Sequence, residues 1–449
     1  MSAAREPGLA APARWIFAAA LGLYLAIAAW LVWRTSILEP YSDMFDWIAR
    51  HERFRADGDL GRYLWAPHNF HHLVWTFAIL DLDTRAFGAS SYLFLAMGVL
   101  CLAGTAALLA CAAGAAAGRG LRLIGAGGAV ALSAMGCHVL DASADINTTY
   151  LHALVFAVAA IVLATAPGER APLRRGGVLI CAVAAGLGSA AGLAVWPALL
   201  LVAWRAGDRR WAVAVVITGI AFSLIYLLGQ AAPASPMTAG GLTRLAEAVA
   251  LFVNYLGLPW VRGIPGLGWL VGVMVLGLSL AALIGKGGRD AAWPERTALG
   301  LILFSLTTAV MAGVARTGAT AADFVPMRYA VFLIPLQVGL WILALPYLRR
   351  AWERRPRPME GLVVGAAALM LVHQGLMAAY AVSAHDTTLA LIADFRAGQR
   401  SAAMLPTIYP DLAKAQALSD RMRRQGLYQR ELRPDPPPAQ RIGYFGFMD

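Results

Sequence analysis

The chain contains few charged residues and few cysteines for its length. Of its 449 residues, 14% are charged and 59% are apolar, whereas a soluble domain is about a quarter charged and nearly half apolar. This balance excludes a disordered chain, a collagen-like chain and a coiled coil as descriptions of the whole protein. Four cysteines without C-x-x-C spacing exclude a small disulfide scaffold. The composition predicts an all-α, polytopic membrane protein.

Lysine is nearly absent as well. All but two of the 37 basic residues are arginines, and they gather in short loops between apolar runs. A nucleic-acid-binding protein would carry its basic residues along one face or groove. We therefore interpret the net charge of +11 as a signal of membrane topology and expect no nucleic-acid partner. Neither the phosphate-binding loop G-x-x-x-x-G-K-[ST] nor the nucleophile elbow G-x-S-x-G occurs in the sequence.

Apolar runs of the length that spans a bilayer, ~20 residues, recur along the chain. They cover residues 15–33, 91–117, 121–139, 149–166, 177–203, 211–229, 267–285, 297–314, 328–348 and 360–382. The first is interpreted as an uncleaved anchor, because no small-residue cleavage site follows it. The run 177–203 is too short for two full spans, so a hairpin of two half-length helices is expected, turning near Gly186, Gly188 and Gly192. The total is eleven membrane segments.

The loop charges orient these segments. Six loops hold 18 basic residues, whereas the alternate loops 140–148, 230–266 and 315–327 hold only Arg244, Arg262 and Arg316. The positive-inside rule places the basic loops and the N-terminus in the cytoplasm of a plasma, or bacterial inner, membrane. We expect a transmembrane domain over 1–382, whose first extracytoplasmic loop is 34–90, and an extracytoplasmic tail over 383–449 with an extended stretch at Pro434–Pro438.

The loop 34–90 concentrates the polar residues: it holds eight acidic residues and four of the eight histidines. Residues 43–54 predict an amphipathic helix at the membrane surface, with Asp43 in its first turn and Asp46 on the same stripe. The helix dipole would keep the Asp43 carboxylate ionised. A second interfacial helix is expected from about Phe70 to Leu80. His68 and His72 have a spacing that suits a metal, but they also suit an interfacial belt.

Three stretches resemble the GT-C fold glycosyltransferases, membrane enzymes that take a sugar from a polyprenyl-phosphate carrier. They are EPYSDMFDWI at residues 39–48, APHNFHHLVW at residues 66–75 and ARTGATAADFVPMRYAVF at residues 315–332. The first aligns Asp43 with the family's loop aspartate, although the family commonly has an acidic pair where this chain has Ser42 and Asp43. The resemblance implies a sugar donor on a lipid phosphate, a glycan or lipid acceptor in the cell envelope, and contact with membrane lipids.

Within that reaction, Asp43 would be the general base that takes the acceptor proton. The alternative for this residue is a surface carboxylate that caps a helix. Arg316 and Arg328, with Tyr329, would hold the leaving phosphate, because arginine is always charged and binds phosphate through two donors. The alternative for both arginines is that their side chains extend to the membrane surface. Arg244 and Arg262 are weaker candidates for the phosphate.

The remaining candidates are polar residues of other segments. Asp141 and Asp145 could line the site, bind a cation or orient sugar hydroxyls, but we favour a solvated loop for both. Asp46, His68 and His72 are further candidates for substrate binding. A divalent cation at the donor phosphate is left open. Gln337 and Gln374 lie within spans, where we expect them to bond neighbouring helices.

Other function classes remain open from the sequence. A transporter or lipid flippase usually needs ionisable residues at membrane depth, and the central parts of these spans have none. A flippase with only a polar groove would not need them. An outer-leaflet polysaccharide polymerase or ligase also uses polyprenyl-linked donors, but its large outer loop generally comes late in the chain. A scaffold without catalysis is the last alternative.

Overall fold

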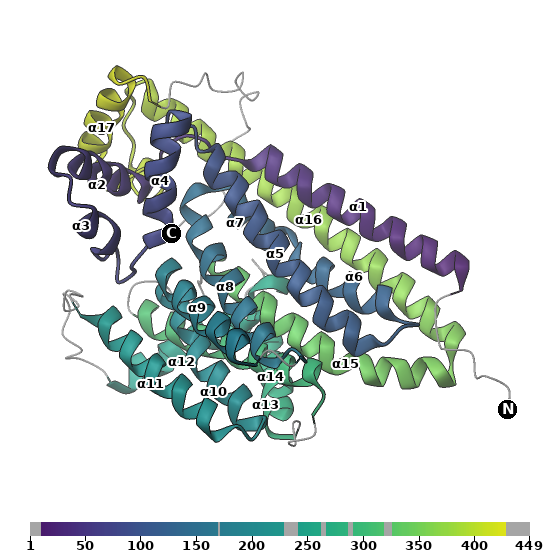
Figure 1. Ribbon diagram of the computed structural model, residues 1–449. Helices are drawn as coiled ribbons and strands as arrows, with labels where there is room; N and C mark the ends of the chain where they lie inside the picture. The colour runs from purple at the N-terminus through teal and green to yellow at the C-terminus, as the bar shows by residue number, and fades with distance from the viewer. Residues whose placement is uncertain are drawn as a thin grey trace.

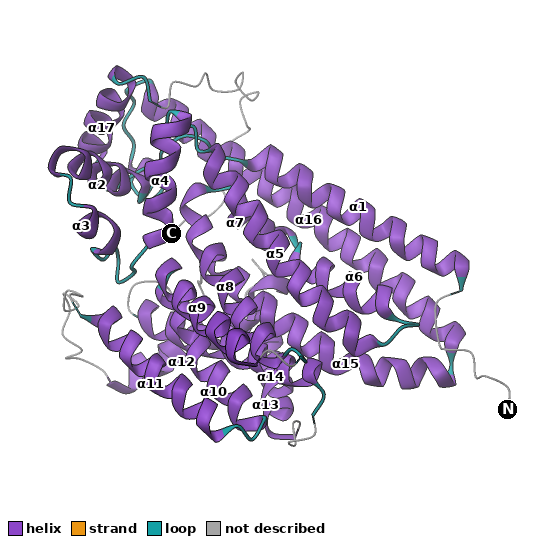
Figure 2. Ribbon diagram, viewed as in Figure 1, coloured by secondary structure: helices purple, strands orange, loops and turns teal. Residues whose placement is uncertain are grey.

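The computed structural model describes residues 10–168, 171–228, 241–261, 266–285, 291–317 and 326–427. Within these ranges the protein is built from helices and contains no β-strand (Figure 2). Arg262, the basic residues Lys286 and Arg289, and the stretch Pro434–Pro438 lie outside the described residues.

The helices follow one another with short connections. The first half of the chain forms α1 (Ala11–Thr35), α2 (Met44–Asp57), α3 (Leu60–Trp65), α4 (Val74–Phe87), α5 (Tyr92–Ala117), α6 (Arg122–Ser133), α7 (Gly136–Ala142), η1 (Asp145–Asn147), α8 (Thr148–Thr165), α9 (Ala171–Gly188), η2 (Ala190–Ala194), α10 (Val195–Arg205) and α11 (Arg209–Leu227). The second half forms α12 (Gly241–Val261), α13 (Leu267–Gly285), α14 (Trp293–Arg316), η3 (Met327–Leu333), α15 (Ile334–Arg354), α16 (Pro356–Arg396), η4 (Ala402–Met404) and α17 (Leu412–Arg424).

The expected spans coincide with helices. Among the described residues, eight helices are long and apolar enough to cross a membrane, or nine when the bent pair α6–α7 counts as one span. The protein is therefore a multi-pass integral membrane protein. The run 177–203 does turn back on itself, but at residues 189–194, between α9 and α10. Gly192 allows that turn, since a Cβ there would lie 2.1 Å from the carbonyl oxygen of Ala185.

The core of the bundle surrounds α8. This helix packs against α5, α9, α10 and α14, and its small residues Ala153, Ala157 and Ala160 are fully buried. Small side chains let helix backbones approach closely, which is how helices associate where lipid supplies no hydrophobic drive.

The glutamines within spans bond neighbouring helices, as expected. The Gln374 side chain accepts a hydrogen bond from the Gly136 amide (2.8 Å) and donates one to the Ala134 carbonyl (3.0 Å). These two groups flank the 59° bend between α6 and α7, where the helical hydrogen bonds are interrupted. Gln374 on α16 thus satisfies backbone groups that the bend leaves unpaired. The Gln337 side chain lies 3.4 Å from the His138 ring.

Helix α12 occupies a segment that the sequence analysis interpreted as a loop, and this prediction is wrong for residues 241–261. Leu251, Tyr255 and Leu256 bury one face of α12 against α13, α14 and η3. The backbones of α12 and α13 nearly touch, because a Cβ at Gly272 would lie 1.9 Å from the carbonyl oxygen of Val253. A search for apolar runs misses this helix because polar residues interrupt its apolar positions. Its sequence therefore lacks the continuous apolar run that is typical of a membrane span.

A separate group of helices covers one end of the bundle. Figure 1 shows α2, α3, α4 and α17 gathered where α1 and α16 end. α16 continues unbroken to Arg396, so residue 382 falls inside a helix. Apolar residues of loop 34–90 and of tail residues 389–427 form one shared core, in which Phe45 packs edge-on against Phe395 and Tyr409. We call this unit of α2, α3, α4 and α17 the end cap.

Substituting Gly272 by alanine tests the contact between α12 and α13. The added Cβ would collide with the Val253 backbone, which cannot move independently of α12, so we expect a loss of ~1–3 kcal/mol in stability. Gly277 is the matched control on the same helix, because nothing lies within 4 Å of a Cβ built there. Thermal unfolding in detergent measures both variants, and equal unfolding midpoints would contradict the close approach.

Candidate functional site

Asp43 lies at the start of α2, directly before Met44. Its side chain makes no capping hydrogen bond to the helix, so the alternative of a capping surface carboxylate does not describe it. Instead, Oδ2 of Asp43 lies 3.4 Å from Nε2 of His68 and accepts a hydrogen bond of 3.3 Å from Nδ2 of Asn69. The Asp43 side chain keeps 43% of its surface accessible, so water or a ligand can reach it.

A tight turn brings His68 to Asp43. The backbones of His68 and His71 exchange two hydrogen bonds of 2.8 Å, and the residues between them, Asn69 and Phe70, have φ values of 46° and 65°. Two successive left-handed residues are typical of a type I′ turn. The helix expected from about Phe70 to Leu80 is present as α4, but it begins later, at Val74, and continues to Phe87. His68 and His72 do not share a helix.

The surroundings of Asp43 favour its ionised form. Burial alone would raise the pKa of this carboxyl group, but the hydrogen bond and the charge of His68 act in the opposite direction. The charge of Arg328 and the hydrogen bond from Asn69 add to this effect. The pKa of Asp43 consequently lies below its ordinary value, and the group is a carboxylate at neutral pH.

Two arginines enclose Tyr329 on the bundle side of the site. Arg316, the last residue of α14, donates a hydrogen bond to the Tyr329 hydroxyl. The guanidinium centres of Arg316 and Arg328 lie 5.2 Å and 5.7 Å from the centre of the Tyr329 ring. Tyr255 on α12 donates a hydrogen bond of 2.5 Å to the Tyr329 carbonyl, and the Tyr150 ring lies edge-on at 5.3 Å. The sequence analysis grouped Arg316, Arg328 and Tyr329, and the structure brings them together.

His71 links the turn to the membrane hairpin, and the sequence analysis gave it no role. Its Nδ1 accepts a hydrogen bond of 3.2 Å from the Ala190 amide in η2. Burial, followed by the positive charges of His68 and Arg316, lowers the pKa of His71 to about 4. The ring is therefore neutral near pH 7 and free to accept this bond. The repeated histidines of the HNFHH stretch are the only sequence signal for it.

The other two candidates in the loop face away from the Asp43 carboxylate. His72 is fully buried, stacks on Trp65 at 4.4 Å, and directs Nε2 to the Tyr226 carbonyl on α11 at 2.9 Å. It attaches the loop to the bundle. Asp46 accepts hydrogen bonds from the Tyr409 hydroxyl (2.5 Å) and from Nζ of Lys414 (2.8 Å). It attaches α2 to the tail, a contact that no local pattern indicates.

Asp141 and Asp145 are buried, so the expectation of a solvated loop is wrong. They are only 1% and 2% exposed, because α7 and η1 fold this segment against α5, α8 and the end of α1. Asp141 lines a small cavity of about 100 Å³ together with Arg328, Tyr41 and Ser42. Asp145 does not line that cavity.

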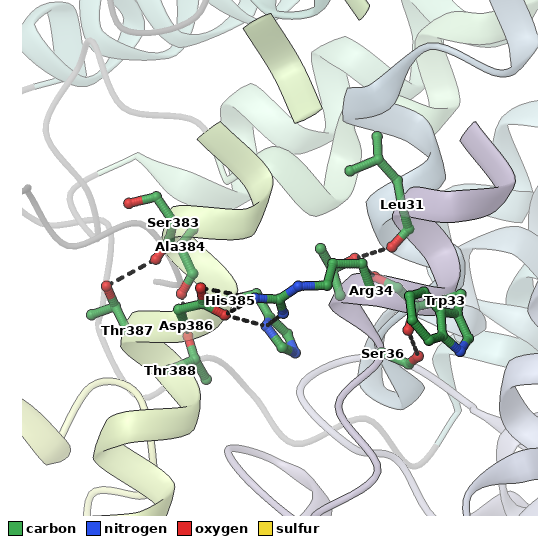
Figure 3. Close-up of polar contacts among 12 residues, drawn as sticks. Leu31, Trp33, Arg34, Ser36, Ser383, Ala384, His385, Asp386, Thr387 and Thr388 are labelled. Atoms are coloured by element: carbon green, nitrogen blue, oxygen red, sulfur yellow. Dashed lines mark hydrogen bonds and ion pairs between the residues drawn. The ribbon is translucent and has the colours of Figure 1, made fainter. Parts of the chain in front are cut away.

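An ion pair fixes the chain where the loop leaves α1. Figure 3 shows Arg34 of α1 reaching the α16 residues His385 and Asp386. Nη2 of Arg34 donates to both carboxylate oxygens of Asp386, at 2.8 Å and 2.9 Å. Charge-assisted bonds of this kind are strong and directional. They hold the end of α1 against α16, nine residues before Asp43.

A larger cavity opens on the other side of His68. It measures about 730 Å³ and is bounded by α2, α3 and α17, and we call it the cap cavity. His68 lines it, so the Asp43 carboxylate lies one side chain away. The site thus has a carboxylate in the middle, arginines on the bundle side and a polar cavity on the cap side.

The search for a metal site in the described part of the chain and the search for relatives both gave negative results. Across the described ranges, no group of three or more His, Cys, Asp or Glu side chains could hold a metal ion. Comparison of the chain with known protein families, with curated proteins and with solved structures finds no match.

Replacing His71 by glutamine tests its role as a neutral anchor. Glutamine can still accept the Ala190 amide but cannot titrate. The ordinary pKa of histidine is 6.5, and in the folded protein the pKa of His71 is about 4. As the pH falls, His71 is therefore protonated in the unfolded chain before it is protonated in the folded protein. Stability should therefore be complete above pH 6.5 and decline as the pH falls towards 4.

We expect the wild type to lose on the order of 2 kcal/mol more than His71→Gln across this pH window. Thermal unfolding of both proteins in detergent, at neutral pH and near pH 4.5, measures the difference. An identical pH dependence would show that His71 is not buried as a neutral ring.

Proposed function

We propose that the protein is a membrane glycosyltransferase of the GT-C type. In this proposal, it moves a sugar from a polyprenyl phosphate to a hydroxyl group of a cell-envelope glycan or lipid, on the extracytoplasmic face. One observation carries the proposal: a carboxylate with a lowered pKa lies at the same end of a membrane bundle as Arg316 and Arg328. The eleven membrane segments expected from sequence are part of this proposal: they are the eight or nine candidate spans together with the α9–α10 hairpin counted as two segments.

The reaction needs a base, an electrophile and a stabilised leaving group. The oxygen of the acceptor hydroxyl forms a bond to the anomeric carbon of the sugar. At the same time, Asp43 accepts the proton of that hydroxyl. The bond from that carbon to the phosphate oxygen breaks, and its electron pair stays on the oxygen. Polyprenyl phosphate leaves with the added negative charge. His68 keeps an oxygen of Asp43 in place, since the two groups lie 3.4 Å apart.

Arg316 and Arg328 supply positive charge for the departing phosphate. Preorganised charge of this kind stabilises the transition state without reorganisation at the moment of reaction. Tyr329 keeps the guanidinium of Arg316 oriented through its hydroxyl. A phosphate bound at the end of the bundle avoids the cost of burying its charge in hydrocarbon, while the prenyl chain stays among membrane lipids.

Substituting Asp43 by asparagine should lower the transfer rate by ~10²–10⁴ and leave donor binding intact, because only the base is lost. Release of polyprenyl phosphate from a panel of polyprenyl-phosphate sugars measures the rate. Glu353→Gln is the matched control. Its carboxylate pairs with Arg349 at 3.8 Å near the far end of α15, so activity should be unchanged.

The rival functions give different results in the same assay. If the wild type consumes no donor but moves polyprenyl phosphates between vesicle leaflets, the protein is a flippase. If Asp43→Asn transfers sugar at the wild-type rate, Asp43 is not the base. A wild type that neither consumes nor moves donors would favour a scaffold.

Substituting Arg316 or Arg328 by glutamine should reduce kcat/KM for the donor by about 10–100-fold, the cost of one charged hydrogen bond. Lysine should reduce it less, since it retains the charge but not the two-donor geometry. Arg244 on α12 is the control, because no hydrogen bond or ring contact connects it to Tyr329 or to Asp43 within the described residues. Equal losses for Arg244→Gln and Arg316→Gln would contradict a specific phosphate site.

A further inference from the structure

The cap cavity is built entirely outside the membrane-spanning helices. Its walls come from α2, from α3 with the residues that follow it, and from α17, which Figure 1 shows at the edge of the molecule. At about 730 Å³ it falls within the ~300–1,000 Å³ typical of ligand sites. Nine charged side chains line it: Asp46, Arg50, Glu52, Arg53, Asp57, Asp59, Arg62, Lys414 and Arg421.

The acidic side chains of the cavity are all engaged within the protein. Asp46 pairs with Lys414 at 2.8 Å and Glu52 with Arg421 at 3.1 Å. Asp59 caps α3 by accepting a bond from the Arg62 amide, and Asp57 accepts one from the Asp59 amide. None of these four carboxylates forms an ion pair with Arg53 or Arg62 within the described residues, and the cavity lining has five basic side chains against four acidic ones.

Three of the lining arginines come from α2 and α3: Arg50, Arg53 and Arg62. Arg50 is held by the carbonyls of Ala66 (2.7 Å) and Arg62 (3.0 Å). Its burial, with a smaller effect from the charges of Arg53 and Arg62, lowers the pKa of Arg50 to about 10. The guanidinium groups of Arg53 and Arg62 are exposed, and no partner for either occurs among the described residues. The charges of Arg53 and Arg62 thus both act against the charge of Arg50, and an anion bound near them would relieve this repulsion.

We propose that the cap cavity binds the acceptor, and that this acceptor is a water-soluble glycan carrying carboxylate or phosphate groups. Arg53 and Arg62 bind its anionic groups, while the sugar chain reaches past His68 to present a hydroxyl to Asp43. The cavity and its arginines are described from contacts in the structure. Only the identification of the bound glycan as the acceptor rests on the proposed transferase activity. A free glycan fits better than a lipid headgroup, because no lining residue belongs to a spanning helix.

Binding of defined oligosaccharides tests the proposal without any turnover. The purified protein is placed in phosphatidylcholine nanodiscs and titrated with tetragalacturonate and with neutral maltotetraose. We expect tetragalacturonate to bind, maltotetraose to bind at least tenfold more weakly, and the affinity for tetragalacturonate to fall with salt. Arg53→Gln and Arg62→Gln should each weaken tetragalacturonate binding about tenfold.

Arg55→Gln is the matched control. Arg55 is exposed on the same helix two residues after Arg53, but it does not line the cavity, so its substitution should leave the affinity unchanged. The binding measurement requires no sugar donor and no turnover. Tetragalacturonate can therefore bind even if no donor is consumed, so this inference and the transferase proposal can fail separately.

Three outcomes would overturn the inference. Equal affinity for the two oligosaccharides would show that binding does not require an anionic group on the ligand. Equal weakening by Arg55→Gln and Arg53→Gln would show a non-specific charge effect. If nanodiscs of equal parts phosphatidylcholine and phosphatidylglycerol abolish tetragalacturonate binding to the wild type, the anionic lipid has displaced the oligosaccharide, and the occupant is a lipid headgroup.

Discussion

Keeping the Asp43 carboxylate ionised at the edge of an apolar bundle is the constraint on which the site depends. A carboxyl group moved into hydrocarbon becomes protonated unless opposite charge and hydrogen bonds compensate. Here the compensation comes from two separate parts of the chain, the turn that carries His68 and the segment that carries Arg328. Loss of either part would remove one of the effects that offset burial, so the pKa of Asp43 would rise. The site therefore requires the loop and the bundle to be assembled together.

The end cap provides that assembly. Neither loop 34–90 nor the tail is large enough to bury a core of its own, since small units bury too little apolar surface to be stable alone. Together they share one core, and the bond from the Ser42 amide to the Ile408 carbonyl (2.6 Å) fixes the backbone directly before Asp43. The salt bridge between Asp46 and Lys414 adds a second connection. The tail is thus part of the site, although more than 360 residues separate Asp46 from Lys414 in sequence.

The sequence predicts the spans because their signal is local: each depends on the composition of about twenty consecutive residues. It also predicts α2 from its amphipathic period, and the association of Arg316 with Tyr329 from their places at a loop. The turn at His68–His71 escapes prediction because Asn69 and Phe70, rather than glycines, adopt positive φ. The burial of Asp141 and the packing of the tail depend on contacts between segments that are distant in sequence. Patterns within a short stretch of sequence therefore cannot predict them.

A structure of the protein bound to polyprenyl phosphate in a lipid nanodisc tests the central claim most directly. The account expects the phosphate within hydrogen-bonding distance of Arg316 or Arg328, with the Asp43 carboxylate facing it across the space that a sugar would fill. A phosphate held at the opposite end of the bundle, or one whose approach to Asp43 is blocked by the end cap, would contradict the account.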